Sequence, residues 1–82
     1  MTMPFLIEWV LVTKGKEKRL TDQENMFQIT LEGYRIFPIH QTIDIKRYNN
    51  SDQIGRGEIL ELTLKNNQTI CKYRLVSLHS VN

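Results

Sequence analysis

The sequence has few of the features with which very small proteins reinforce their fold. Cys71 is the single cysteine among 82 residues, so no disulfide can form within the chain. One cysteine and two histidines fall short of the four ligands of a structural zinc site. The segment Gly55-Arg56-Gly57 lacks the spacing of a nucleotide-binding loop. We therefore expect no metal and no cofactor, and a stability that depends on close packing or on self-association.

Long apolar runs, repeats and low-complexity tracts are also absent. Residues 5–12 are mostly apolar, but Glu8 interrupts them, no basic residue precedes them and no signal-type cleavage site follows. The segment is also much shorter than the roughly 20 residues that span a bilayer. We expect a buried first strand here, in a cytoplasmic protein without a membrane partner, and the lone cysteine fits a reducing compartment.

Charge of one sign is scarce as well. The chain has 11 lysines and arginines against 9 aspartates and glutamates, which leaves a formal net charge of +2. This excess is too small to attract nucleic acid or a membrane strongly. Hydrophobic residues at 40% and charged residues at 24% are typical of a globular domain.

What the sequence does contain is a repeated alternation of apolar and polar residues. Phe27, Ile29 and Leu31, for example, alternate with polar neighbours. A period of two is that of a β-strand with one buried face. The segments with a strand-like pattern are residues 5–12, 27–36, 42–48, 58–64 and 69–78.

Turn signals separate these segments. Gly33 shifts the phase of the alternation, which indicates a β-bulge or a sharp bend. Asn66 and Asn67 favour a tight hairpin, because Asn tolerates a positive φ. The polar residues 49–52 form a turn, and residues 20–25 hold at most one short helical turn.

We therefore predict a single all-β domain over residues 1–82. It has about five mostly antiparallel strands that form a small barrel or a strongly curled sheet. A flat open sheet with one additional helix is the main alternative.

A basic turn follows the first predicted strand. Lys14, Lys16, Lys18 and Arg19 surround a single Glu17. One interpretation is a loop that contacts an anionic ligand or the phosphates of a nucleic acid. The more common interpretation is a solvated turn, in which Lys and Arg are frequent. The four cations are the candidate anion or nucleic-acid contact of this chain.

A second set of cations lies close in sequence to aromatic residues, an arrangement that can bind single-stranded nucleic acid. Adjacent strand residues point to opposite faces, however, so the aromatics are expected inside and the cations in solvent. Nucleic acid is therefore the less favoured partner. These cations are Arg35, Lys46, Arg47, Arg56, Lys72 and Arg74, and the aromatics are Tyr34, Phe37, Tyr48 and Tyr73.

Residues with catalytic potential do not form a known arrangement. His40 follows a proline in a predicted loop, and His79 lies near the C-terminus with no nucleophile elbow beside it. Cys71 stands among apolar strand residues and is expected to be buried and inert. Trp9, the sole tryptophan, is expected in the core. We expect no enzymatic activity.

Three stretches resemble a known family: VTKGKEKR at residues 12–19, EGYRIFP at 32–38 and YRLVSL at 73–78. They are similar to the YtmB-like family of small uncharacterised proteins from Bacillus-type Firmicutes, and the similarity covers essentially the whole chain. The resemblance implies a bacterial source and a cytosolic location. It implies no activity and no functional residue, because none is assigned to the family.

Three functional hypotheses follow. The first is a small non-catalytic binding module that acts through a protein or nucleic-acid partner. The second is a self-associating structural or accessory protein, most simply a homodimer, because the core is small and both ends of the chain are apolar. The third and least favoured is an unrecognised enzyme.

Overall fold

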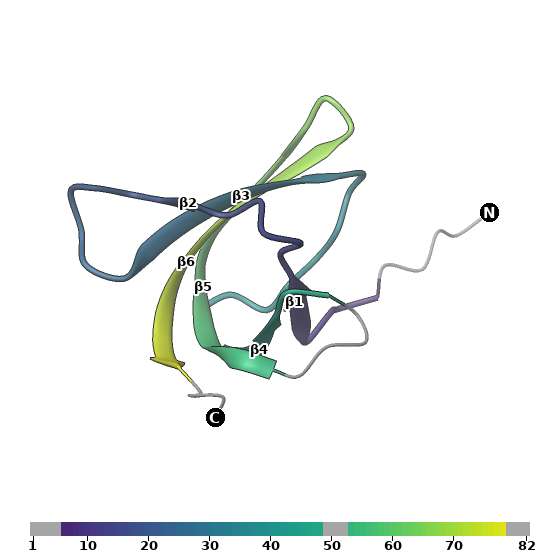
Figure 1. Cartoon of the computed structure of the whole chain (residues 1–82). Coiled ribbons are helices and arrows are strands. Elements are labelled where there is room, and N and C mark those ends of the chain that lie inside the picture. Colours follow the sequence, from purple (N-terminus) through teal and green to yellow (C-terminus); the bar gives the residue numbers. More distant parts are fainter. Residues whose placement is uncertain (1–5, 49–52, 79–82) are drawn as a thin grey trace.

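The structure is a computed structural model that describes residues 6–48 and 53–78, and in this part the chain forms six strands and no helix (Figure 1). The strands are β1 (Val10–Val12), β2 (Lys18–Arg19), β3 (Met26–Glu32), β4 (Thr42–Lys46), β5 (Gln53–Lys65) and β6 (Gln68–Leu78). They form one sheet in the order β1-β4-β5-β6-β3-β2. No helix in the described ranges has the length and apolar composition needed to cross a membrane.

The predicted all-β class is confirmed, and so is mostly antiparallel pairing. Only β1 and β4 pair in parallel, which makes the sheet mixed. A sixth strand arises because two residues of the basic turn form β2, where Lys18 pairs with Gln28 and Arg19 with Phe27. The polar residues 20–25 form turns without a helical segment.

We predict a small barrel or a strongly curled sheet, and the strand pairing does not give a barrel. Strands β1 and β2 stand at the two ends of the strand order, and no ladder joins them within residues 6–48 and 53–78. Closure requires paired edges, and a strand of two residues offers little to pair. The first strand is also shorter than predicted: before β1, only an isolated bridge joins Ile7 to Ile36.

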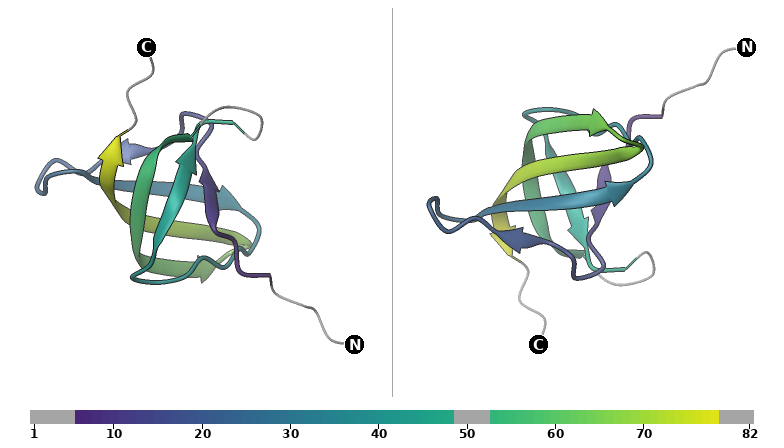
Figure 2. Two further views of the ribbon diagram at one scale, coloured as in Figure 1. Left: turned by 90° about the horizontal axis from the view of Figure 1, so that it is seen from below. Right: turned by 90° about the horizontal axis from the view of Figure 1, so that it is seen from above.

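The long hairpin of β5 and β6 lies at the centre of the sheet (Figure 2). Its turn is made by Asn66 and Asn67, with φ angles of 54° and 60°. Two successive positive φ values give the twist that a two-residue hairpin needs, as the sequence predicts. Gly33, with a φ of 79°, ends β3 and turns the chain away, which confirms the predicted bend.

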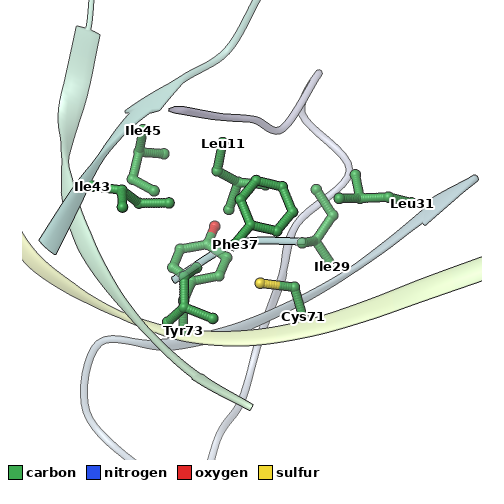
Figure 3. Close-up of a cluster of buried hydrophobic side chains, with 9 residues drawn as sticks. Leu11, Ile29, Leu31, Phe37, Ile43, Ile45, Cys71 and Tyr73 are labelled. Atoms are coloured by element: carbon green, nitrogen blue, oxygen red, sulfur yellow. The ribbon is translucent and has the colours of Figure 1, made fainter. Parts of the chain in front are cut away.

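One face of the sheet packs into a single hydrophobic cluster (Figure 3). Side chains from both sides of the strand order meet here, including Leu11 of β1 and Ile29 of β3. Phe37, from the loop after β3, fills the middle at 1% exposure. The cluster consists of Leu11, Ile29, Leu31, Phe37, Ile43, Ile45, Ile59, Cys71 and Tyr73. Full burial of one such side chain stabilises the fold by about 1.5–3 kcal/mol.

Trp9 does not belong to this core, and the expectation that it would is wrong. Its side chain is 55% exposed, whereas Leu11, two residues further, is fully buried. Only the backbone of Trp9 is fixed, because its carbonyl accepts a hydrogen bond of 3.2 Å from the Asp44 N–H. The large aromatic residues of the core cluster are Phe37 and Tyr73 instead.

Several predictions fall on residues outside the described ranges. These are the part of the first strand at Phe5, the turn at residues 49–52, the candidate His79 and the last apolar residues of the chain.

The close approach of β5 to β6 makes Gly55 a sensitive position. A Cβ atom added there would lie 2.3 Å from the backbone oxygen of Ser77, which only a backbone shift can relieve. We expect Gly55→Ala to lower the free energy of unfolding by about 1–3 kcal/mol, the usual cost of overpacking, in urea denaturation. Gly57→Ala is the matched control, because its nearest contacts of 3.2 Å include the flexible end of Ile45. Equal losses in the two variants would contradict the packing argument.

Candidate functional site

The basic turn between β1 and β2 uses its own backbone N–H groups internally. The Lys14 N–H donates to the Arg47 carbonyl at 2.7 Å, and the Lys16 N–H donates to the Thr13 carbonyl at 3.0 Å. The Gly15 N–H donates to the Thr13 hydroxyl at 3.3 Å. A turn with positive φ at Lys14 and Gly15 can form an anion-binding nest when its N–H groups are free. Here they are satisfied, so an anion can be met only by side chains.

A cavity of about 280 Å³ lies beside this turn. The chain that leaves β1 runs toward β3 and β2 (Figure 1), and the cavity is lined by the end of β1, by the turn and by the end of β3. Its lining residues are Val12, Thr13, Lys14, Lys16, Thr30, Leu31, Glu32 and Arg35. The lining thus contains three cations, Lys14, Lys16 and Arg35, and one carboxylate, that of Glu32.

The four predicted contact residues are therefore divided into two pairs. Lys14 and Lys16 line the cavity with exposed side chains. Lys18 and Arg19 lie on β2, where the Arg19 guanidinium stands 4.8 Å from the centre of the Phe27 ring. Glu17 does not line the cavity, and one of its carboxylate oxygens is buried without a hydrogen-bond partner in the part of the chain described.

Arg35 is the third cation that lines the cavity. Nothing in the sequence distinguishes it from the five other cations of the second set. Its guanidinium Nε donates to Glu8 Oε2 at 3.0 Å, and its Nη2 makes a second bond to the same carboxylate. The hydrogen bond with Glu8 raises the pKa of Arg35. The Arg35 N–H donates to the Thr69 hydroxyl at 2.8 Å, and this hydroxyl donates to the Gly33 carbonyl at 2.7 Å. Arg35 is thus held rigidly at the wall of the cavity.

Two other cations of the second set form ion pairs with carboxylates on neighbouring strands. Lys72 Nζ lies 2.9 Å from Glu61 Oε2, and Arg56 Nε lies 3.5 Å from Asp44 Oδ1. By contrast, no ion pair involving Lys14 or Lys16 is found among the described residues. These two lysines combine exposure, an unpaired charge and a concave surface.

Among the described residues, the two groups with catalytic potential, His40 and Cys71, occupy different environments. His40 is an exposed residue with a φ of 61°, and its Nδ1 lies 3.6 Å from Glu58 Oε2. Cys71 is fully buried, which confirms that expectation, and burial raises the pKa of its thiol to about 12. Within residues 6–48 and 53–78, no cluster of three potential metal ligands occurs.

Burial of Cys71 predicts a loss of stability at high pH. Between its ordinary pKa of 9.0 and the raised pKa of about 12, the thiol is ionised in the unfolded chain but protonated in the fold. The unfolded state then binds fewer protons, so the free energy of unfolding falls with rising pH, by about 1.4 kcal/mol per pH unit at most. Tyr73, whose pKa is also raised by burial, contributes above its ordinary value of 10.0.

Urea denaturation between pH 8 and 10 measures this slope, with Cys71→Ala as the control that removes the thiol. We expect the wild-type curve to fall more steeply than that of the variant from about pH 9 upward. Parallel curves for the two proteins would show that the thiol ionises equally in both states.

Comparisons with known proteins place these features in a family. A family model described as a domain of unknown function (DUF2584) matches residues 1–82. The uncharacterized protein YtmB of Bacillus subtilis (strain 168) is 38% identical over 82 residues, which cover all of both chains. The X-ray crystal structure of YtmB from Bacillus subtilis superposes with a TM-score of 0.86, covering 100% of this chain and 99% of the other. The resemblance seen in the sequence is thus confirmed, and this chain belongs to the DUF2584 family, whose function is unknown.

Proposed function

We propose that this chain is a small non-catalytic binding module of the bacterial cytoplasm, and that its partner is a protein with an acidic contact group. The observation that carries the proposal is the cavity in which Lys14 and Lys16 present unpaired charges beside the fixed guanidinium of Arg35. An exposed charge that has no partner in its own fold is available to a ligand of opposite sign at no cost in broken contacts.

A nucleic acid fits the arrangement less well than a protein does. Binding to a phosphate backbone requires several free cations along one path. Here Arg35, Arg56 and Lys72 are each held by a carboxylate. Phe37 and Tyr73 are buried in the core, so these two rings cannot stack on bases. Tyr34 and Tyr48 are 51% and 52% exposed, so the expectation that the aromatic residues lie inside is wrong for these two.

The strong curl of the sheet that the sequence predicts is part of this proposal, because it would position the two walls of the site. Side chains of β1 and β3 share one core, although three strands separate them in the sheet order. Both strands also line the cavity. We propose that the sheet curls far enough for its two ends to flank the binding site without closing into a barrel.

A retention experiment with bacterial lysate tests the binding function. The immobilised chain should retain a discrete protein after nuclease treatment, and Lys14→Ser with Lys16→Ser should lose it. Lys18→Ser with Arg19→Ser is the matched control, because it removes the same charge outside the cavity. If nuclease treatment abolishes the retention, the result favours nucleic acid as the partner. If the two double variants retain the same proteins as each other, the proposed site is refuted.

A second candidate function, self-association as a homodimer, is supported by the end of β6. The pairing of β6 with β3 stops at Arg74, and the Leu75 N–H still donates to the Asn25 carbonyl at 2.8 Å, so residues 76–78 have no neighbouring strand on that side in the described structure. Val76 and Leu78 lie there with exposures of 56% and 70%, and residues 75–78 carry no charge. Uncharged apolar edges of this kind favour pairing with another strand, including that of a second copy.

Light scattering at high protein concentration tests the homodimer. If β6 pairs with its copy, the wild-type chain should have a dimer mass, and Val76→Lys with Leu78→Lys should have a monomer mass. The variant must keep the circular dichroism of the wild type, which both exposed positions allow. A monomeric wild-type chain would end this candidate.

A further inference from the structure

We propose that the cavity between β1 and β3 binds an extended segment of the partner protein, which pairs with the open edge of β1 and places a carboxylate between Lys14 and Lys16. The inference rests on the proposed function and specifies its mode: strand addition guided by one acidic side chain.

The edge of β1 that faces away from β4 is available for pairing. In the ladder with β4, the Trp9 carbonyl points toward β4, where it accepts a hydrogen bond from the Asp44 N–H. Neighbouring residues of a strand direct their N–H and C=O groups to opposite sides. The backbone N–H and C=O groups of Val10 and Val12 therefore point away from β4, to a side on which the described structure has no neighbouring strand.

The chain itself shows that this edge accepts an extended segment. Just before β1, the Glu8 N–H donates to the Ile36 carbonyl at 2.8 Å, and Ile7 and Ile36 form a parallel bridge. Since the Trp9 carbonyl bonds to Asp44 of β4, the Glu8 N–H points away from β4. Pairing on the outer edge is thus seen at this bridge, and no ladder continues it along β1 in the described residues.

The opposite wall of the cavity is a second open edge. Strand β2 pairs with Phe27 and Gln28, and the Leu20 N–H donates to the Met26 carbonyl, so residues 29–32 of β3 have no strand on that side in the described ranges. Thr30, Leu31 and Glu32 of this part of β3 line the cavity. A segment that lies between the two strands meets unpaired backbone groups on both sides, which is the arrangement that strand addition exploits.

Charge complementarity identifies the chemistry of the segment. Lys14 and Lys16 are exposed and unpaired in the described structure, and Arg35 stands behind them with its guanidinium fixed by Glu8. Glu32 is the single carboxylate of the lining and disfavours a segment with several acidic residues. One aspartate or glutamate flanked by β-branched residues satisfies both conditions.

The size of the cavity agrees with part of a peptide. Sites for whole small ligands and cofactors usually measure about 300–1,000 Å³. At about 280 Å³, this cavity stands at the lower end of that range, and its volume suits one or two residues of a longer chain. A free inorganic anion would also lack the backbone N–H groups that usually hold it, because those of the turn are satisfied.

Fluorescence polarisation with defined peptides tests the inference. The probe is a fluorescein-labelled peptide with blocked ends that contains one aspartate among alternating valine and threonine. The control peptide has lysine in place of aspartate. At ~0.15 M salt, where charges more than about 8 Å away are screened, the acidic peptide should bind and the basic one should not. Lys14→Ser with Lys16→Ser should weaken binding about tenfold, and Lys18→Ser with Arg19→Ser should leave it within about twofold.

Peptides with N-methyl groups on alternate residues test the strand pairing separately. Methylation removes the N–H donors of one edge of the peptide, and the segment lies between two open edges, so each of the two alternating sets should weaken binding. Methylated forms that bind as tightly as the parent peptide would refute strand addition, and equal weakening by the two double variants would refute the cavity as the site. An acidic peptide that does not saturate up to about 1 mM would overturn the whole inference.

A short single-stranded RNA serves as the competing ligand in the same assay. Tighter binding of RNA, with a steep dependence on salt, would overturn the assignment to a peptide. If the lysate experiment retains a protein through Lys14 and Lys16 while every acidic peptide fails, the binding function stands and only the extended mode is wrong.

Discussion

The pairing of β5 with β6 is the constraint on which the rest of the structure depends. This hairpin is the longest element of the fold and forms the centre of the sheet, so every other strand is attached to one of its two sides. The left-handed turn at Asn66 and Asn67 sets its register near the turn, and two register shifts, between Ile59 and Glu61 and between Arg56 and Gly57, follow before the close approach at Gly55. Because hairpin contacts are local in sequence, they are also entropically the least costly contacts to form first. The parallel pair β1–β4 and the short β2 depend on this platform.

A sheet built outward from one hairpin ends in two edges, and these edges explain the position of the cavity. Leu11 of β1 and Ile29 of β3 belong to the same core cluster, and in the proposed curl this brings the ends of the sheet toward each other. No ladder joins β1 to β2 within the described residues, and the basic turn connects them. Backbone polar groups at such an edge need water or a partner, whereas the buried side chains behind it do not. In this proposal the site is a consequence of incomplete closure.

The alternation of apolar residues predicted the strand segments well, because burial of one face imposes a period of two regardless of partner. Asn66 and Asn67 predicted their hairpin for the same local reason. Strand order and closure depend on contacts between distant segments, and β2 exists only because Phe27 and Gln28 lie opposite Lys18 and Arg19. Trp9 shows the limit of residue type as a guide to burial, since its position before an edge strand exposes it and Phe37 takes its place. The importance of Arg35 could not be inferred from sequence either, because its partner Glu8 lies 27 residues away.

The role of each cation in the basic turn depends on the contacts that its side chain makes in the fold. In the sequence, Lys14, Lys16, Lys18 and Arg19 are equivalent members of one cluster. In the fold, Arg19 lies over an aromatic ring and Lys18 belongs to a strand, so these side chains take part in the sheet. Lys14 and Lys16 project beside a cavity whose far wall contains an arginine already neutralised by Glu8. In the proposed binding mode, an arginine neutralised by Glu8 adds hydrogen-bond geometry without strong repulsion of its neighbours, and the two exposed lysines supply the attraction. Recognition in this mode depends on where a ligand places its single negative charge rather than on the net charge of the protein, so a nearly neutral chain is compatible with an acidic partner.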